Sequence, residues 1–187
     1  MATPTAAAEI VQHEIRIEAP PPTVFEFLTD PEKMVRWMGT EATLDPHPGG
    51  VYRVNLNGHE HVRGEVVELV PDRRLVFTWG WEEAILPVAP GESTVEISLE
   101  PDGNATLLRL THRDLPQDMR AFHRRGWEYA LARLALAAAG QDPGPDPFTS
   151  LGGTRVARSL PTRYLYKFAR RRLTSILHGG RRKRRRP

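Results

Sequence analysis

The stretch from residue 115 to residue 140 constrains the fold of this chain more than any other part of it. It reads LPQDMRAFHRRGWEYALARLALAAAG, and its apolar and ring-bearing residues recur at steps of three and four. This spacing places side chains along one side of an α-helix. The positions on this stripe are Met119, Phe122, His123, Gly126, Trp127, Ala130, Leu134 and Ala137. A helix with so long an apolar stripe must pack against a broad apolar partner.

The flanks of this stretch carry start and stop signals. Asp114 is suited to cap the helix, Pro116 fits the first turn, and Gly140 is a natural end. The following charged residues fall largely outside the stripe: Arg120, Arg124, Arg125, Glu128 and Arg133.

Seven strand-like runs precede the helix. The first, over residues 9–19, alternates apolar and charged positions, which is typical of a half-buried strand. After three prolines, residues 23–29 and 31–38 are predicted to form two short helices. Six further runs follow, separated by turn signals such as Asn57-Gly58: 40–44, 51–56, 61–70, 74–81, 94–99 and 106–112. Sequential hairpins predict an antiparallel meander.

The order strand, two short helices, six strands and one long helix predicts an α+β fold. A curved antiparallel sheet of about seven strands would wrap around the C-terminal helix and leave a space between the two layers.

Charge divides the chain into two parts. Residues 1–140 hold 13 Lys and Arg against 21 Asp and Glu, which leaves a formal charge of −8. Residues 141–187 hold 13 Lys and Arg against two Asp, which leaves +11. We therefore predict a globular domain over 9–140. The remainder, 141–187, reads as a Pro/Gly linker, a basic amphipathic helix and an Arg-rich tail.

Several residues resemble a known family. These are residues 21–28 with Trp37, the segment DPHPGG at 45–50, Gly64, Pro71, the segment RLVFTW at 74–79, Thr106, His112, and Gly126-Trp127. Together they resemble the START-like (SRPBCC) superfamily, and within it the group named for the heat-shock-protein-90 ATPase activator homologues. The resemblance covers residues 9 to about 138. It implies a helix-grip fold enclosing an apolar cavity. Its members bind lipids, polyketides or other hydrophobic small molecules, and some cyclise or dehydrate them.

A set of large rings is predicted to face the space between sheet and helix: Tyr52, Phe77, Trp79, Trp81 and Trp127, with Trp37 from the second short helix. Core packing is the ordinary interpretation of such a set. With the resemblance, we favour a ligand cavity. Gly126 supports this choice, because a glycine in mid-helix costs about 1 kcal/mol against alanine and is easier to explain where room is needed.

His112 and His123 complete the candidate ligand-binding residues. One ends an inward strand face and the other lies on the helix stripe, so both approach the same space. Each could orient a polar ligand group or transfer a proton. The alternative is a histidine that is simply hydrogen-bonded in the core.

No motif for catalysis, a cofactor or a metal is evident. The pair His59 and His61, with His47 upstream, is too sparse for a zinc site. No nucleophile elbow, phosphate-binding loop or His-Glu-x-x-His occurs. We therefore favour binding of a hydrophobic small molecule without turnover. The alternatives are a cyclase or dehydratase on the same scaffold, and a chaperone-interacting or membrane-recruited adaptor.

The basic segment 160–187 has several possible partners. It combines apolar and positively charged positions and ends in an arginine run. An anionic membrane surface or an acidic protein partner, including the acidic main domain, is favoured over nucleic acid because of the apolar residues. A solubilising or disordered tail is the simplest alternative. Without cysteine, a signal-peptide pattern or a run of about 18 apolar residues, we expect a cytoplasmic protein, with peripheral membrane association as an option.

Overall fold

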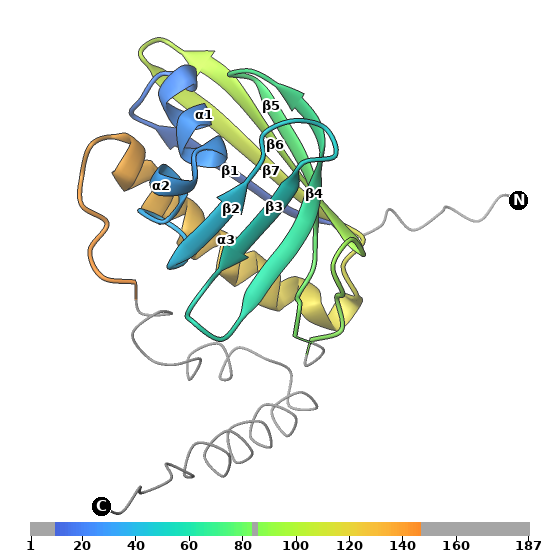
Figure 1. Ribbon diagram of the computed structural model, residues 1–187. Coiled ribbons are helices and arrows are strands. Elements are labelled where there is room, and N and C mark those ends of the chain that lie inside the picture. Colours follow the sequence, from blue (N-terminus) through green and yellow to red (C-terminus); the bar gives the residue numbers. More distant parts are fainter. Residues whose placement is uncertain (1–9, 84–85, 147–187) are drawn as a thin grey trace, which may run out of the picture.

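The structure is a computed structural model that describes residues 10–83 and 86–146. Within these residues, two short helices and one long helix accompany one seven-stranded antiparallel sheet (Figure 1), so the predicted α+β class is confirmed. The elements are β1 (Val11–Ile17), α1 (Pro21–Thr29), α2 (Pro31–Met34), β2 (Glu41–Leu44), β3 (Val51–Asn55), β4 (His61–Val70), β5 (Arg74–Trp79), β6 (Ser93–Asp102), β7 (Ala105–Arg113) and α3 (Gln117–Ala138).

The sheet is the predicted meander with one addition at its edge. Its strand order is β1-β7-β6-β5-β4-β3-β2, so the first strand of the chain pairs with the last one. In that pairing Val11 lies opposite His112 and Ile17 lies opposite Thr106. Figure 1 shows α3 running along one face of the curved sheet, with α1 and α2 near the C-terminal end of α3.

The core lies between that face of the sheet and α3. Along β6 the buried residues alternate with half-buried ones, and Leu108, Leu110 and His112 of β7 are buried in the same way. From α3, Met119 and Leu134 are fully covered. The period of two along the strands and the stripe along the helix therefore meet as predicted.

The start of α3 differs from the prediction. Asp114 does not cap the helix: its backbone has a φ of 66°, and the N-cap position is taken by Pro116, without a side-chain cap. The predicted end is confirmed. Gly140 has a φ of 76°, a conformation that glycine adopts readily, and the N–H of Gln141 donates to the carbonyl of Leu136 at 2.9 Å.

Two other predicted elements are shorter than expected. Helix α2 ends at Met34 and the chain continues to Met38 in turns, because the N–H groups of Trp37 and Met38 both return to the carbonyl of Met34. Strand β5 ends at Trp79. At Gly80 the chain passes so close to residue 89 that a Cβ atom would lie 1.8 Å from its carbonyl oxygen, and Trp81 forms only an isolated bridge with Val62.

Arg133 is buried, although the helical pattern places it outside the apolar stripe. Its guanidinium donates to the carbonyl oxygens of Trp37 at 3.1 Å, Pro143 at 3.0 Å and Gly144 at 3.0 Å. These carbonyls satisfy the donors of a charge that would otherwise be costly to cover. As a result, the beginning of the predicted linker, up to Asp146, lies back against α3.

Within residues 10–83 and 86–146, no helix is long and apolar enough to cross a membrane. The predicted basic helix and Arg-rich tail fall in 147–187, outside the described residues.

Candidate functional site

An open pocket lies between α3 and the ends of the central strands. It has a volume of about 120 Å³. Its wall comes from the turn after α2, the β3–β4 connection, the end of β5, α3 and the segment that follows α3. The lining residues are Trp37, Met38, Gly39, Leu56, Asn57, Trp79, Trp81, Phe122, His123, Arg125, Gly126, Trp127, Tyr129, Ala130 and Asp146.

The pocket is small compared with sites for drug-sized ligands, which measure roughly 300–1,000 Å³. It is closer to the cavity of about 150 Å³ that holds benzene in an engineered protein core. The space between sheet and helix is thus mostly filled by side chains. What remains accommodates about one ring, with any larger part of a ligand outside the mouth.

Six of the nine candidate binding residues line this pocket: Trp37, Trp79, Trp81, His123, Gly126 and Trp127. The other three, Tyr52, Phe77 and His112, lie in the core and are not part of the lining. Tyr52 and Phe77 stack on each other with ring centroids 3.9 Å apart, and this stacked pair fills part of the space that the fold leaves. Burial raises the pKa of the Tyr52 phenol, so its hydroxyl stays protonated.

The inner wall is a cluster of packed indole rings. Trp79 is the centre of it: the Trp127 ring lies at 5.1 Å and the Trp81 ring at 6.3 Å, edge to face. Trp81 in turn contacts Phe122 of α3, at 6.0 Å between centroids. Tilted and edge-to-face contacts at these distances are the favourable arrangements for aromatic pairs. The wall therefore consists of rings that brace one another.

His112 and His123 hold two of these indoles by hydrogen bonds. The Nε1–H of Trp127 donates to Nδ1 of His112 at 3.0 Å. The Nε1–H of Trp81 donates to Nε2 of His123 at 3.3 Å. Because an indole only donates, each of these histidine nitrogens must be unprotonated. The two histidines therefore act as acceptors that orient the tryptophan walls.

The second nitrogen of each histidine is also engaged. Nε2 of His112 lies 2.9 Å from Oγ of Ser93, whose hydroxyl donates to the carbonyl of Trp79 at 2.9 Å. Nδ1 of His123 lies 3.0 Å from the carbonyl of Met119. The network thus assigns the proton to Nε2 in His112 and to Nδ1 in His123, and every nitrogen has a partner.

The same burial keeps both rings neutral. Burial, followed by the neighbouring His123, lowers the pKa of His112 to about 2. Burial lowers the pKa of His123 to about 4, against the opposing effect of the Met119 carbonyl. Neither imidazole is charged near neutral pH, so neither is a ready proton donor.

Sequence reasoning did not identify the polar rim of the pocket. Arg125, Tyr129 and Asp146 contribute to the lining near its mouth, and the Tyr129 hydroxyl lies 3.3 Å from Oδ1 of Asp146. Tyr129 lies one helical turn before Arg133, whose bonds to the carbonyls of residues 143 and 144 place Asp146 there. That contact depends on tertiary structure, and no spacing in the sequence signals it.

The β3–β4 connection forms another part of the wall that the sequence did not reveal. Oδ1 of Asn57 accepts from the N–H groups of His59 and Glu60, at 3.1 and 3.0 Å. The Asn57 amide also donates to the Glu60 carboxylate at 2.8 Å. Burial raises the pKa of this carboxyl. The predicted Asn57-Gly58 turn is thus a tight polar loop in which Asn57 and Glu60 are buried while Gly58 and His59 are exposed, and Leu56 and Asn57 line the pocket together with the indoles.

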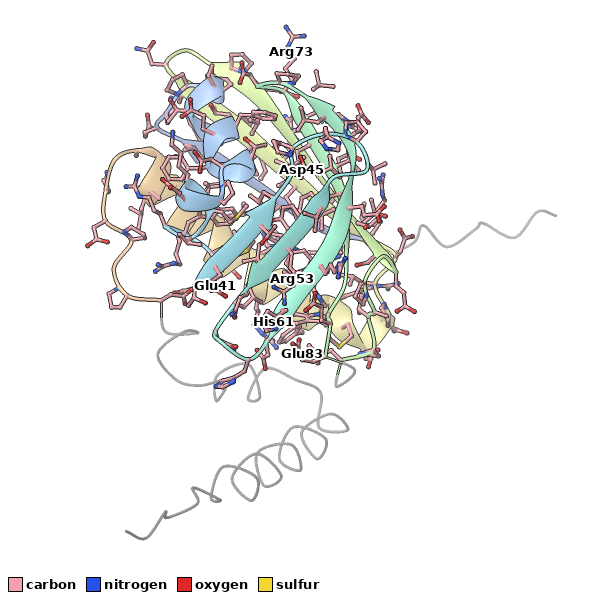
Figure 2. The ribbon with its side chains drawn as sticks, viewed as in Figure 1. Glu41, Asp45, Arg53, His61, Arg73 and Glu83 are labelled. Carbon is pink, nitrogen blue, oxygen red and sulfur yellow. The ribbon has the colours of Figure 1, made fainter. Side chains whose placement is uncertain are left out.

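His61 pairs with an acidic residue and not with His59. Its Nδ1 lies 2.7 Å from Oε1 of Glu83, and its backbone N–H donates to the same carboxylate at 2.9 Å (Figure 2). The ligand atoms of His61, Glu82 and Glu83 lie within 4.8 Å of one another and could hold a cation. Arg53, however, binds both oxygens of Glu82, at 2.7 and 2.8 Å. All three side chains are therefore already paired within the protein.

The chain is similar to a known protein family and to several solved structures. Residues 18–139 match the family described as activator of Hsp90 ATPase homolog 1-like protein. No curated protein matches the chain. The solution NMR structure of an AHSA1-like protein from Rhizobium etli is 46% identical, and the match covers 79% of this chain and 92% of that one, with a TM-score of 0.61.

Two further solved structures are similar. CalU16 from Micromonospora echinospora is 30% identical over 70% of this chain and 76% of its own, with a TM-score of 0.57. DynU16, a protein of the dynemicin biosynthetic locus, is 26% identical over 72% of this chain, with a TM-score of 0.62. The match spans 49% of the DynU16 chain.

Proposed function

The chain belongs to the family of activator of Hsp90 ATPase homolog 1-like proteins, and from this premise we propose that it binds a hydrophobic small molecule in the pocket between its sheet and α3. Proteins with this fold bind hydrophobic ligands. The observation that carries the proposal is an open space of about 120 Å³ whose inner wall consists of tryptophan rings. Such a concave, mostly apolar site with a few polar groups is what small-molecule binding requires.

The rigidity of the wall supports the proposal. Trp81 and Trp127 are each held by a histidine at 3.3 and 3.0 Å. A ligand that enters between such rings does not have to order them first, so less of the binding free energy is lost to entropy. The histidines thus have a structural reason to lie beside a binding pocket without taking part in chemistry.

Catalysis by these histidines is the less favoured alternative. A cyclase or dehydratase needs an acid or base that reaches the substrate with a suitable pKa. His112 is not part of the lining. His123 does line the pocket, but both of its nitrogens are hydrogen-bonded and its pKa is lowered to about 4. We therefore favour binding without turnover.

An adaptor role through the basic segment 160–187 is a separate proposal, because that segment lies outside the described residues. Removing the residues after Asp146 should abolish sedimentation with anionic liposomes if the segment recruits the protein to membranes. Ligand binding should stay intact, since Arg133 keeps residues 143 and 144 in place without the tail.

The proposed pocket can be tested with a blocking variant and a matched control. Gly126→Leu adds a side chain at the lining position where a Cβ atom meets no protein atom within 4 Å. Ala121→Leu adds similar bulk on an exposed position of α3 outside the lining. Small aromatic compounds should quench the tryptophan fluorescence of the wild-type protein and of Ala121→Leu, with at least about tenfold weaker binding to Gly126→Leu.

Native mass spectrometry with the same compounds gives a second readout. Absence of binding to the wild-type protein across small aromatics, fatty acids and larger polycyclic compounds would refute the proposal. Equal affinity for the two leucine variants would place the binding site elsewhere.

A further inference from the structure

A chain of three hydrogen bonds joins the sheet to α3 behind the pocket wall. Nε1–H of Trp127 donates to Nδ1 of His112 at 3.0 Å, and Nε2 of His112 lies 2.9 Å from Oγ of Ser93. The Ser93 hydroxyl donates to the carbonyl of Trp79 at 2.9 Å. Ser93 is 1% exposed and His112 0%, so these groups depend on one another for their partners and not on bulk water.

The strand register places these groups in a row. Ser93 of β6 lies directly opposite Trp79 of β5. In the pairing of β6 with β7, Val95 lies opposite His112, so Ser93 and His112 are diagonal neighbours on adjacent strands. Trp127 of α3 lies over this row, with its ring centroid 6.1 Å from that of His112. The hydrogen bonds therefore tie α3 to three adjacent strands of the sheet.

The direction of the chain is fixed at both of its ends. An indole nitrogen only donates and a backbone carbonyl only accepts, whereas a hydroxyl and a neutral imidazole can each do both. Trp127 donates at one end and the Trp79 carbonyl accepts at the other. All three bonds are made only if Ser93 accepts from Nε2–H of His112. Nδ1 of His112 then carries no proton and is available to Trp127.

We propose that Ser93 is a positioning residue for the pocket: its hydroxyl anchors the His112 ring, and that ring holds the Trp127 indole. The inference rests on the proposed function, because Trp127 lines the proposed pocket whereas Ser93 acts on it through His112. Without the hydroxyl, the imidazole keeps one of its two bonds and gains freedom to turn, so the indole is held less firmly in one orientation. A ligand then has to order the indole when it binds, and this lowers its affinity.

Two variants and a matched control isolate the hydroxyl. Ser93→Ala removes it and Ser93→Thr keeps it. Thr106→Val, the control, also removes a buried hydroxyl that donates to a backbone carbonyl, that of Ala19 at 2.7 Å, and it does so at a residue outside the pocket lining.

Toluene, a single ring, is the probe in a titration followed by the indole N–H signals of ¹⁵N-labelled protein. Its affinity should fall about 2- to 10-fold in Ser93→Ala, the loss expected when one more side chain has to be ordered on binding. Ser93→Thr and Thr106→Val should bind toluene as the wild-type protein does.

The indole signals report the positioning without any ligand. In Ser93→Ala the Trp127 N–H signal should move upfield and exchange faster with deuterium, since its bond to His112 weakens. The Trp37 N–H, which donates to the Phe27 carbonyl at 2.9 Å, should keep its position and its rate. A general loss of stability would instead accelerate the exchange of both indoles. In the wild-type protein, ¹⁵N spectra of the imidazoles should place the proton of His112 on Nε2.

Failure of this inference and failure of the proposed function give different results. If neither toluene nor the wider panel of compounds binds, but the Trp127 signal responds to Ser93→Ala as expected, Ser93 positions the indole and the proposed function is wrong. If toluene binds, and neither its affinity nor the Trp127 signal differs between Ser93→Ala and Thr106→Val, the pocket stands and the role of Ser93 is wrong. A proton on Nδ1 of His112 in the wild-type protein, or a Ser93→Thr protein that behaves like Ser93→Ala, would overturn that role as well.

Discussion

Gly126 is a residue of α3 at which a Cβ atom can be added without displacing protein atoms. A Cβ atom there meets nothing within 4 Å, and the residue is exposed at the pocket lining. Because glycine in a helix interior costs about 0.5–1 kcal/mol relative to alanine, we expect Gly126→Ala to raise the free energy of unfolding by that amount. Urea denaturation monitored by circular dichroism measures it. A destabilised Gly126→Ala protein would mean that the backbone there needs a conformation that alanine resists.

The surroundings of single side chains were only partly predictable from the sequence. The inward positions of Trp79, Trp81 and Trp127 follow from strand and helix periods, and the structure confirms them as buried. The period does not distinguish a ring that borders open space from one that is stacked against a neighbour, as Phe77 is on Tyr52. The pairing of each histidine with one indole depends on distances of about 3 Å between elements far apart in the chain, which no single-sequence pattern contains.

At the scale of elements, the capped helix α2 lies just before part of the pocket wall in the chain. Oδ1 of Asp30 accepts from the N–H groups of Glu32 at 2.8 Å and Lys33 at 3.3 Å. This short helix leads directly to Trp37 and Met38, which line the pocket. We expect Asp30→Ala to lower the free energy of unfolding by about 1 kcal/mol and Asp30→Ser to retain most of it. Chemical denaturation of both variants checks the expectation, and equal stability of the two would show that the cap contributes nothing.

Arg133 connects α3 to the segment that follows it. Its bonds to the carbonyls of Pro143 and Gly144 should be lost in Arg133→Met, while the apolar part of the side chain remains. We expect limited proteolysis after residue 140 to become markedly faster, and the free energy of unfolding to fall by about 1–3 kcal/mol because the Trp37 carbonyl loses its donor.

Arg73→Met is the matched control for this change. Arg73 is exposed and projects from the top of the molecule in the view of Figure 2. The control should be cleaved at the wild-type rate. Wild-type cleavage of Arg133→Met as well would show that the segment is held by other contacts.

The elements themselves were largely predictable. Strand β4 was predicted with the observed bounds, and the Asp30-Pro31 start of α2 was confirmed, because alternation and capping are local signals. Asp114 looked equally suitable as a cap, yet its φ of 66° directs the chain away from that role. Arg133 falls outside the apolar stripe, and a helical pattern cannot show that the chain returns to cover it.

For the whole molecule, the neutral histidines predict sensitivity to acid. Burial lowers the pKa of His112 to about 2 and of His123 to about 4, below the usual value of 6.5, and burial lowers the pKa of His13 in the same direction. Between pH 6.5 and these folded-state values, the unfolded chain binds protons that the native state does not. Stability is therefore fully present above about pH 6.5 and decreases as the pH falls.

Each of the two core histidines should lower the free energy of unfolding by about 1.4 kcal/mol per pH unit in this window. Urea denaturation at pH 7, 6 and 5 measures the slope. His123→Asn retains an amide donor for the Met119 carbonyl. It should remove the contribution of one histidine to the dependence of the free energy of unfolding on pH. A stability that stays constant from pH 7 to pH 5 would contradict the assignment of both rings as buried and neutral.

The position of Asp146 has a consequence for the way the proposed ligand would enter and leave the pocket. Asp146 lines the pocket and is followed in the sequence by 41 further residues. A partner that binds the first residues after Asp146 would lie close to the pocket mouth, since one residue of extended chain spans about 3.3–3.6 Å. A partner that held the protein by these residues would therefore fix the orientation of the pocket mouth. Uptake and release of the proposed ligand would then take place next to that partner.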